Sequence, residues 1–248
     1  MGLVYSTKSV VRDSSLVIYW DPKNPRYRRK RELAGDRQST SVGASQRDIT
    51  RDAIIATTSA SAQEYGSTAP LPGTGYSINA WVKRTDVTTG NWDIIASFDN
   101  GGPRFRQMWF GWYYNQTSRI HFSMPYYNGN AGADPPTSND GAATYWSVDP
   151  FFSEAGLDFN IGQWYNFSMT YDNKTRIAKT YVNGVYARQG TRPGLGDLNE
   201  PNNAPLRMYG TDGPSRNSEL GLFMVYNRAI TALEVEENYH AFKGRFGY

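Results

Sequence analysis

Residues 164–187 constrain the fold of this chain more than any other segment. Residues 164–171 and 176–182 are strand-like runs separated by the turn sequence Asp172-Asn173-Lys174-Thr175. Asn183-Gly184 then supplies the two positive φ angles that a type I′ turn requires, and leads into a third run at residues 185–187. Three consecutive antiparallel strands joined by tight turns predict a β-sheet protein.

Further strand-like runs recur along the chain, and Gly, Pro, Asn or Asp residues close each of them. They lie at residues 16–20, 76–82, 93–98, 107–114, 119–124, 206–209 and 219–226. The runs 107–114 and 119–124 flank a short polar stretch, which predicts a hairpin. The run 76–82 alternates, so we expect a strand with one buried and one polar face. Alternation in the run 219–226 predicts one face formed by Leu220, Leu222, Met224 and Tyr226.

One amphipathic helix is predicted near the C-terminus. Thr231 is a favourable N-cap residue, and Glu234 three positions later completes a capping box. Val235, Tyr239 and Phe242 follow at i, i+4 and i+7, so their side chains share one face of the helix. This face is expected to pack on the sheet.

Composition separates the first 75 residues from the rest. Residues 26–75 are rich in Arg, Ser, Thr, Ala and Gln and contain few large apolar residues. We therefore expect residues 1–75 to form an N-terminal strand and a polar, basic docking segment packed on the main body, residues 76–248. With 39% hydrophobic and 15% aromatic residues, the chain predicts one all-β sandwich of two antiparallel sheets with a short C-terminal helix.

The residue inventory argues against several kinds of site. The chain has no cysteine, which excludes a disulfide framework, a thiolate metal site and a cysteine nucleophile. Its two histidines, His121 and His240, belong to no recognisable nucleophile motif, and we expect both to be structural. No apolar run approaches the roughly 20 residues of a membrane helix, and the first residues lack the apolar stretch of a signal peptide. Membrane insertion is not expected.

Several segments together resemble the concanavalin A-like, laminin-G-like lectin-fold superfamily. They are YSINAWV at 76–82, QWYNFSMTYD at 163–172 with YVNGV at 181–185, and LGLFMVYNRAIT at 220–231. Two further segments, LVIYWDPKNP at 16–25 and ENYHAFKGRFG at 237–247, resemble the two ends of phage-encoded members. The resemblance implies a concanavalin A-like jelly-roll sandwich, and its ends imply a virion structural protein of a tailed phage.

The function implied by this resemblance is that of a non-catalytic capsid decoration or tail-associated subunit, located in the virion. Other capsid or tail proteins and further copies of the chain would be its partners. A glycan-binding adhesin that recognises host surface carbohydrate is the alternative. Some relatives are glycoside hydrolases, but the Glu-x-Asp-x-x-Glu pattern of sandwich glucanases is absent. Glu234, Glu236 and Glu237 lie on the predicted helix, and we expect no enzymatic activity.

Aromatic side chains are the candidates for carbohydrate binding, because an aromatic face stacks on a sugar ring while nearby amides bind its hydroxyls. The candidates are Trp112, Tyr114, Tyr126, Tyr127 and Trp146. Alternation places Phe110, Trp112 and Tyr114 on one face of their strand, and one face of that strand must belong to the core. Trp and Tyr also dominate subunit interfaces, and we favour an interface over a sugar site.

Two polar segments complete the candidate sites. Arg26, Arg28, Arg29, Lys30 and Arg31 form a basic run that only Glu32 opposes. We expect this run to dock on an acidic or polar partner surface. Nucleic acid is not expected as a partner, because the net charge is only +3 and no second basic stripe exists.

A calcium site is the remaining possibility for a cofactor. Asp99 and Asn100 offer hard oxygen ligands of the kind that calcium prefers. The sequence Asp99-Asn100-Gly101-Gly102 is also an ordinary turn, because these residues tolerate left-handed conformations. We expect a turn, with no metal and no other cofactor.

Overall fold

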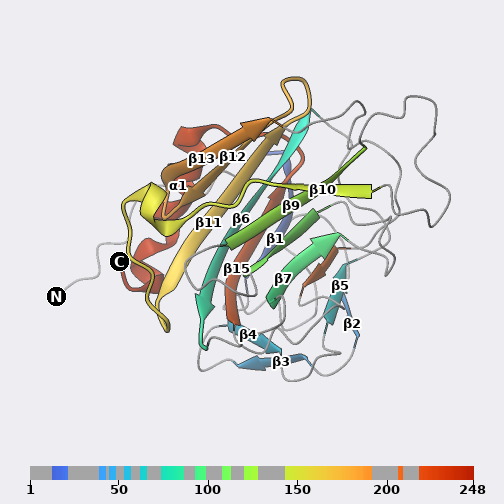
Figure 1. The fold of residues 1–248 in the computed structure, drawn as a ribbon. Helices are drawn as coiled ribbons and strands as arrows, with labels where there is room; N and C mark the ends of the chain where they lie inside the picture. The colour runs from blue at the N-terminus through green and yellow to red at the C-terminus, as the bar shows by residue number, and fades with distance from the viewer. Residues whose placement is uncertain are drawn as a thin grey trace.

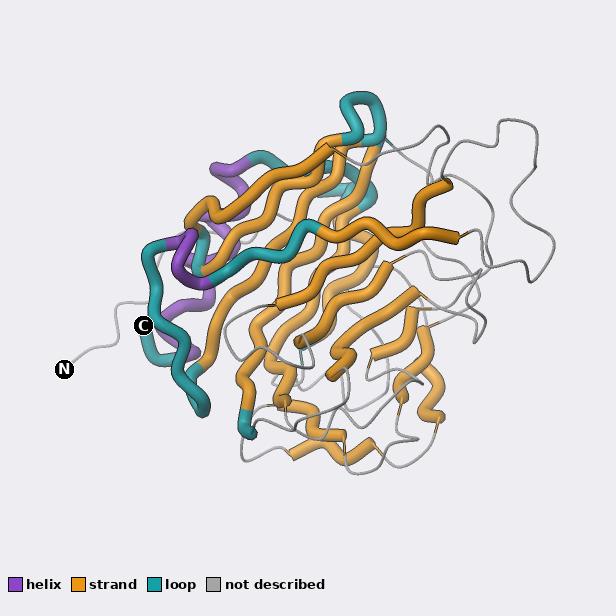
Figure 2. The backbone as a smooth tube through the Cα atoms, viewed as in Figure 1, coloured by secondary structure: helices purple, strands orange, loops and turns teal. Residues whose placement is uncertain are grey.

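The structure is a computed structural model that describes residues 13–21, 39–42, 45–48, 53–56, 62–65, 74–86, 93–98, 108–112, 120–127, 143–191, 206–208 and 218–248. Two antiparallel sheets pack face to face, and a short helix lies against the outer side of one of them (Figure 1). This arrangement confirms the predicted all-β sandwich with a C-terminal helix (Figure 2). None of the helices in this described part is long and apolar enough to span a bilayer.

The first sheet has eight strands and contains the three consecutive antiparallel strands predicted from residues 164–187. Its order is β13 (Val185–Thr191), β12 (Ile177–Val182), β11 (Trp164–Asp172), β6 (Gly75–Arg84), β15 (Ser218–Tyr226), β4 (Ala53–Ala56) and β3 (Ser45–Asp48), with β1 (Leu16–Trp20) also paired to β15. β1 and β4 share one edge of β15, because β4 pairs near Leu220 and β1 pairs from Phe223 to Tyr226. The N-terminal strand therefore lies beside the last strand of the chain.

The second sheet has seven strands. Its order is β10 (Ala143–Ser147), β9 (Ile120–Tyr127), β8 (Met108–Trp112), β7 (Asp93–Phe98), β14 (Leu206–Met208), β5 (Ala62–Tyr65) and β2 (Ser39–Val42). The predicted hairpin is confirmed, since β8 and β9 pair with Phe110 opposite Phe122. β10 continues the sheet on the other side of β9.

The type I′ turn between β12 and β13 is confirmed. Asn183 has a φ of 51° and Gly184 a φ of 78°. The Asn183 carboxamide oxygen also accepts a hydrogen bond from the backbone N–H of Asn166 at 2.9 Å. Gly184 is required for a second reason, because a Cβ there would lie 3.2 Å from the ring of Tyr239. The turn is thus fixed both by its own backbone and by the helix packed against it.

The core between the two sheets is formed mainly by aromatic and branched side chains. Phe110 and Phe122 of the seven-stranded sheet stack with ring centroids 4.8 Å apart. Phe167 and Val225 of the eight-stranded sheet are fully buried in the same core. The 3₁₀ turn η2 (Phe152–Ala155) adds Phe152, whose ring meets that of Phe167 edge-on.

The helix α1 (Ala232–Phe242) begins as predicted. The Thr231 hydroxyl accepts from the backbone N–H of Glu234 at 3.2 Å, and the Glu234 carboxylate accepts from the backbone N–H of Thr231 at 2.7 Å. These two hydrogen bonds form the capping box. The helix continues into the 3₁₀ turn η3 (Lys243–Phe246), and Gly247, with a φ of 92°, closes it in the left-handed region.

The outer face of the eight-stranded sheet is also buried, which differs from the expectation of one polar face on β6. Ser77, Asn79 and Trp81 are all fully buried, because α1 and η3 cover them. The Trp81 ring lies between Phe246, at a centroid distance of 4.4 Å, and Tyr239, at 5.6 Å. The prediction of a half-buried strand is therefore wrong for this part of β6.

A bulge in β15 corrects the predicted face of that strand. Leu220 pairs with Val82 and Leu222 with Trp81, so Gly221 is an extra residue on β15. Leu220 therefore points into the core between the sheets, whereas Leu222 lies under α1. The four residues predicted to share one face are therefore divided. Leu220 lies in the core between the two sheets, and the other three lie in a second apolar cluster between the eight-stranded sheet and the C-terminal helices, namely Leu222, Met224 and Tyr226.

Gly221→Ala should lower the free energy of unfolding by about 1–3 kcal/mol, the usual range for overpacking. A Cβ at Gly221 would lie 2.5 Å from Cε1 of Phe246 and 3.0 Å from the Trp164 ring. Gly244→Ala is the matched control, because nothing lies within 4 Å of a Cβ there. Urea unfolding of both variants provides the measurement, and equal stabilities would contradict the role of Gly221.

The first 75 residues contribute strands to both sheets. β3 and β4 extend the eight-stranded sheet next to β15, and β2 and β5 extend the seven-stranded sheet next to β14. Part of the segment that we expected to pack on the sandwich as a docking element is thus built into it. The basic run at residues 26–31 lies outside the described residues.

Candidate functional site

Three of the five aromatic candidates for carbohydrate binding lie on adjacent strands of the seven-stranded sheet. Tyr126 and Tyr127 end β9, and Trp146 lies on β10. In the register of these strands, Tyr126 pairs with Thr144, and Trp146 pairs with Met124. The strand pairing thus places these backbone positions on neighbouring strands although they are about 20 residues apart in the sequence, and a shared carbohydrate site stays a prediction.

Trp112 does not belong to a surface site, and its assignment to carbohydrate binding is wrong. It is fully buried at the end of β8. Its ring meets Phe167 edge-on at a centroid distance of 5.5 Å and also contacts Phe159 at 5.3 Å. The Arg84 guanidinium lies 5.2 Å from the ring centroid. With these neighbours, no face of the indole is open to a sugar ring.

The other predicted sites fall outside the described residues. These are Tyr114, the calcium candidates Asp99 and Asn100, and the basic run Arg26, Arg28, Arg29, Lys30 and Arg31. Within the described ranges, no three His, Cys, Asp or Glu side chains come together in a group that could hold a metal ion.

A buried carboxylate–histidine pair joins β9, which carries His121, to Asp149 in the chain that follows β10. His121 Nδ1 lies 3.1 Å from the Asp149 carboxylate, which also accepts a hydrogen bond from the backbone N–H of Phe122 at 3.1 Å. Asp149 is 1% exposed and His121 is 9% exposed. The sequence indicated a structural role for His121 but did not reveal Asp149 as its partner. The pair fixes the chain that follows β10 to β9.

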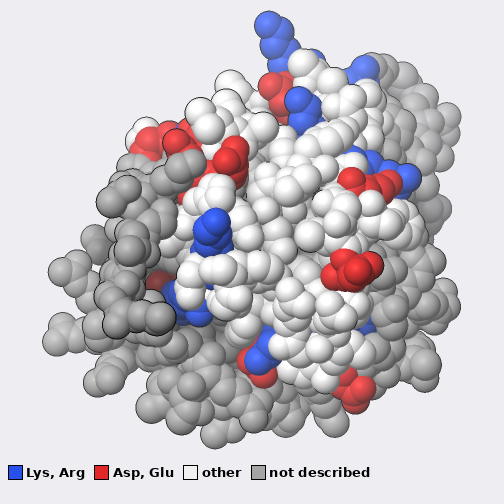
Figure 3. All heavy atoms as spheres, turned by 90° about the vertical axis from the view of Figure 1, so that its left-hand side faces the viewer, with Lys and Arg blue, Asp and Glu red and all other residues white. Residues whose placement is uncertain are grey.

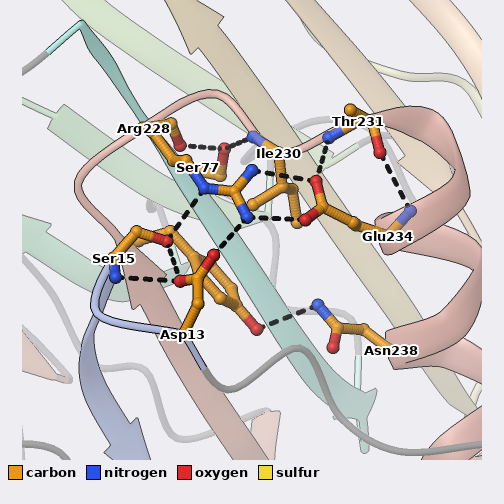
Figure 4. Close-up of polar contacts among 9 residues, drawn as sticks. Asp13, Ser15, Ser77, Arg228, Ile230, Thr231, Glu234 and Asn238 are labelled. Carbon is orange, nitrogen blue, oxygen red and sulfur yellow. Dashed lines mark hydrogen bonds and ion pairs between the residues drawn. The ribbon is translucent and has the colours of Figure 1, made fainter.

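A second polar cluster ties the N-terminal strand to helix α1 (Figure 4). The Arg228 guanidinium donates to both carboxylate oxygens of Glu234, at 2.9 and 2.5 Å, and to Asp13 at 2.6 Å. It also donates to the Ser15 hydroxyl at 3.0 Å. The backbone carbonyl of Arg228 accepts from the Ser77 hydroxyl at 2.8 Å. Segments from both ends of the chain are thus held by one side chain.

The charges in this cluster shift the pKa values of its carboxyl groups. The hydrogen bond from Ser15, together with the one from Arg228, lowers the pKa of Asp13 to about 2. The hydrogen bond from Arg228 lowers the pKa of Glu234 to about 2, although partial burial opposes this shift. The two carboxylates raise the pKa of Arg228 further above its ordinary value. All three groups are therefore charged near neutral pH.

The cluster should make the protein less stable in acid. Both carboxyl groups have a lower pKa in the folded state than their ordinary values of 3.8 and 4.5. The unfolded chain therefore binds protons first, and stability falls as the pH drops from about 4.5 towards about 2. Because Asp13 and Glu234 are partly exposed, we expect a joint loss of only about 1–2 kcal/mol.

Urea unfolding at pH 5 and pH 2.5 measures this loss. The control is the double variant Asp13→Asn with Glu234→Gln, which removes both titrating groups and keeps their size. The wild type should lose more stability than the double variant over this interval. Equal losses in the two proteins would show that the Arg228 cluster does not contribute.

Two packed antiparallel sheets, a covered outer face and a short C-terminal helix define a lectin-like β-sandwich. Residues 57–236 match the Laminin_G_3 family model, described as the concanavalin A-like lectin/glucanases superfamily. The chain belongs to this family. No curated protein matches the chain by sequence.

Among solved structures, the chain is similar in fold to binding domains of botulinum neurotoxins. The type G receptor binding domain has a TM-score of 0.63 at 16% identity, covering 91% of this chain and 51% of that chain. The serotype D binding domain has a TM-score of 0.65 at 10% identity, with coverages of 91% and 51%. The binding domain of neurotoxin DC in complex with SialylT has a TM-score of 0.61 at 10% identity, with coverages of 92% and 51%. This chain spans about half the length of each.

Proposed function

We propose that this chain is a non-catalytic structural protein of a tailed-phage virion, either a capsid decoration protein or a tail-associated subunit. Two segments resemble phage-encoded members, and the observation that carries the proposal is that residues 16–21 of the first meet the second, residues 237–247, in the fold. Arg245 of the second segment binds Asp21 of the first at 2.8 Å. Both segments lie against β15, since β1 pairs with it and Arg245 also donates to the Gly221 carbonyl at 3.3 Å.

The proposal that the chain is not an enzyme is supported by the roles of three buried or partly buried carboxylates among the described residues. Asp149 binds His121, Glu219 binds Lys83 at 2.8 Å, and Glu234 belongs to the Arg228 cluster. Each of these groups has a partner of opposite charge or an imidazole donor, as expected of carboxylates that hold strands and helix in place. A glycosidase would instead need two carboxyl groups facing one another across a substrate.

Co-sedimentation with particles that lack the protein tests the proposed function. Deletion of the N-terminal residues would be a poor variant, because β1 and Asp13 are built into the fold. Reversing the charge of Arg28, Arg29 and Lys30 to glutamate leaves those contacts intact. Wild type should sediment with the particles, and the reversed variant should do so more weakly and with less dependence on salt. Failure of wild type to bind would contradict the virion role.

A glycan-binding adhesin is the second candidate function. It is favoured by the adjacent aromatic positions on β9 and β10, and by the shared fold with a domain whose complex with SialylT has been solved. A glycan array with wild type, Tyr127→Ala and Trp146→Ala tests it. Binding that is specific to certain sugars and is lost in these variants would favour the adhesin over the virion subunit.

We also propose that neither function needs a cofactor. The calcium candidates Asp99 and Asn100 are expected to form an ordinary turn. Thermal unfolding with calcium and with excess chelator should give the same midpoint. A midpoint that rises with calcium and is unaffected by calcium in an Asp99→Asn variant would identify a real site.

A further inference from the structure

The edge of the eight-stranded sheet formed by β13 is open. β12 is the only strand that pairs with β13 in the described part of the chain, and β13 is the outermost strand of this sheet in Figure 1. Gln189 and Thr191 are exposed, and Gly190, which has no side chain, is partly exposed through its backbone. Such an edge presents backbone N–H and C=O groups with which another strand can pair.

The pairing of β12 determines which residues of β13 point these groups outward. Successive residues of a strand direct their backbone groups alternately to its two neighbours. Asn183, at the end of β12, donates its backbone N–H to the Asn166 carbonyl of β11 at 2.8 Å, so the odd-numbered positions of β12 face β11. The even-numbered positions of β12 therefore face β13.

Alternate residues of β13 consequently face away from β12. Ala178 is an even-numbered position of β12 and pairs with Gly190, so the backbone groups of Gly190 point to β12. Its neighbours Gln189 and Thr191 direct their backbone groups to the open edge. No hydrogen bond to these outward groups comes from any of the described residues. They are therefore free to pair with a further strand.

β13 lacks most of the features that keep an edge strand from pairing. Proline and lysine are common features of this kind, and the sequence of the strand, VYARQGT, contains neither. Its one charged residue, Arg188, forms an ion pair with Glu154 of η2 at 3.1 Å. Charged side chains of both signs border a broad uncharged area on this side of the molecule (Figure 3). Charge on β13 itself therefore does not oppose the approach of a second copy.

The residues of β13 are complementary to themselves in an antiparallel pair centred on Gln189. The two Gln189 side chains then lie opposite one another, and each carboxamide is both a donor and an acceptor. Arg188 lies opposite Gly190, which has no side chain, and Ala187, the bulged residue, lies opposite Thr191. A pair centred on Arg188 would instead set two like charges directly opposite, which is destabilising.

We propose that the chain forms a two-fold symmetric dimer in which β13 pairs antiparallel with β13 of a second copy, with Gln189 on the axis. Pairing of β13 with β3, at the other end of the sheet, fits less well, because β3 has only four residues and a head-to-tail contact leaves an open end. The inference goes beyond the proposed function and depends on neither a virion nor a glycan. One strand pair buries less area than a standard interface, so the dimer should dissociate on dilution.

Sedimentation equilibrium of the purified chain over a range of concentrations measures the dimer. Gln189→Pro removes an outward N–H that β12 does not use, so the strand itself should tolerate the proline. Each copy then loses one hydrogen bond to the other, and the dissociation constant should be at least roughly tenfold higher than that of Gln189→Ala. Gln189→Ala is the matched control, because it removes the same side chain but keeps the N–H. Thermal unfolding confirms that both variants are folded.

Three outcomes would overturn the inference. One is a wild type that stays monomeric up to about 1 mM, the concentration range of a very weak complex. Another is an equal dissociation constant for Gln189→Pro and Gln189→Ala, which would assign the contact to a different surface. The third is growth beyond the dimer, because a two-fold contact between identical strands closes on itself.

Disulfide cross-linking tests the register, because the chain has no cysteine. Gln189→Cys sets two thiols opposite one another at a Cα separation of about 5.5 Å, which suits a disulfide. Lys179→Cys is the matched control, since Lys179 is exposed on β12 and pairs with Gln189. Its two copies would lie three strand spacings apart, roughly 14 Å, too far for a disulfide. Mild oxidation should cross-link the chain through position 189 and not through position 179, and equal yields or no cross-link at 189 would overturn the inference.

Discussion

Trp112→Ala is expected to lower the free energy of unfolding by about 3–5 kcal/mol, the usual cost of removing a fully buried tryptophan. The indole packs against the aromatic rings of Phe152, Phe159 and Phe167 in the core between the sheets. Its removal leaves a cavity that these rings cannot fill, because strand and turn backbones hold them in place. Urea unfolding at neutral pH measures the loss.

This variant separates a core role from a binding role. If Trp112 stacked on a sugar, its replacement by alanine would abolish glycan binding while the midpoint of unfolding stayed close to that of wild type. Tyr127→Ala provides the comparison, because Tyr127 is the carbohydrate-binding candidate at the end of β9. A Trp112→Ala protein as stable as wild type would contradict the buried position of the indole.

Local sequence signals predicted the elements that depend on neighbouring residues. The type I′ turn follows from Asn183-Gly184, and the capping box follows from the spacing of Thr231 and Glu234. Both are formed by residues at most three positions apart, so their geometry depends little on the rest of the chain. The pairing of the two strands after residue 164 could be predicted for the same reason.

Burial of the outer sheet face could not be predicted, because it depends on a segment far along the chain. Asn79 belongs to the polar face predicted for residues 76–82, yet it and its partner Asn166 on the neighbouring strand are both fully buried beneath the C-terminal segment. They remain compatible with burial because they bind each other: the Asn166 amide donates to Asn79 at 3.0 Å, and the Asn79 amide donates to Asn166 at 3.2 Å. A residue pattern records the polarity of a strand but not what later covers it.

The candidate sites were predicted less well, for two physical reasons. Alternation divides the aromatic residues of this strand into two sets but does not say which set faces the core, and Phe110 and Trp112 proved to be buried. Asp149 was missed as the partner of His121 because the two are 28 positions apart and meet only through the pairing of β9 with β10. Contacts between strands require the register, which no local motif supplies.

Trp81→Ala should also cost about 3–5 kcal/mol of stability, but with a local consequence that Trp112→Ala does not have. Trp81 is fully buried between Tyr239 and Phe246, the two rings through which α1 and η3 rest on the sheet. Its removal should therefore loosen the C-terminal segment before the sandwich itself unfolds. Hydrogen exchange of residues 232–246 measures this effect and should increase in Trp81→Ala far more than in Trp112→Ala.

Trp81→Phe is the matched control for this prediction. The Trp81 indole N–H has no hydrogen-bond partner among the described residues, so phenylalanine loses only part of the packed area and no hydrogen bond. It should retain most of the stability and protect residues 232–246 nearly as well as wild type. Exchange that increases evenly over the whole chain in Trp81→Ala would mean that the C-terminal segment and the sandwich unfold as one unit.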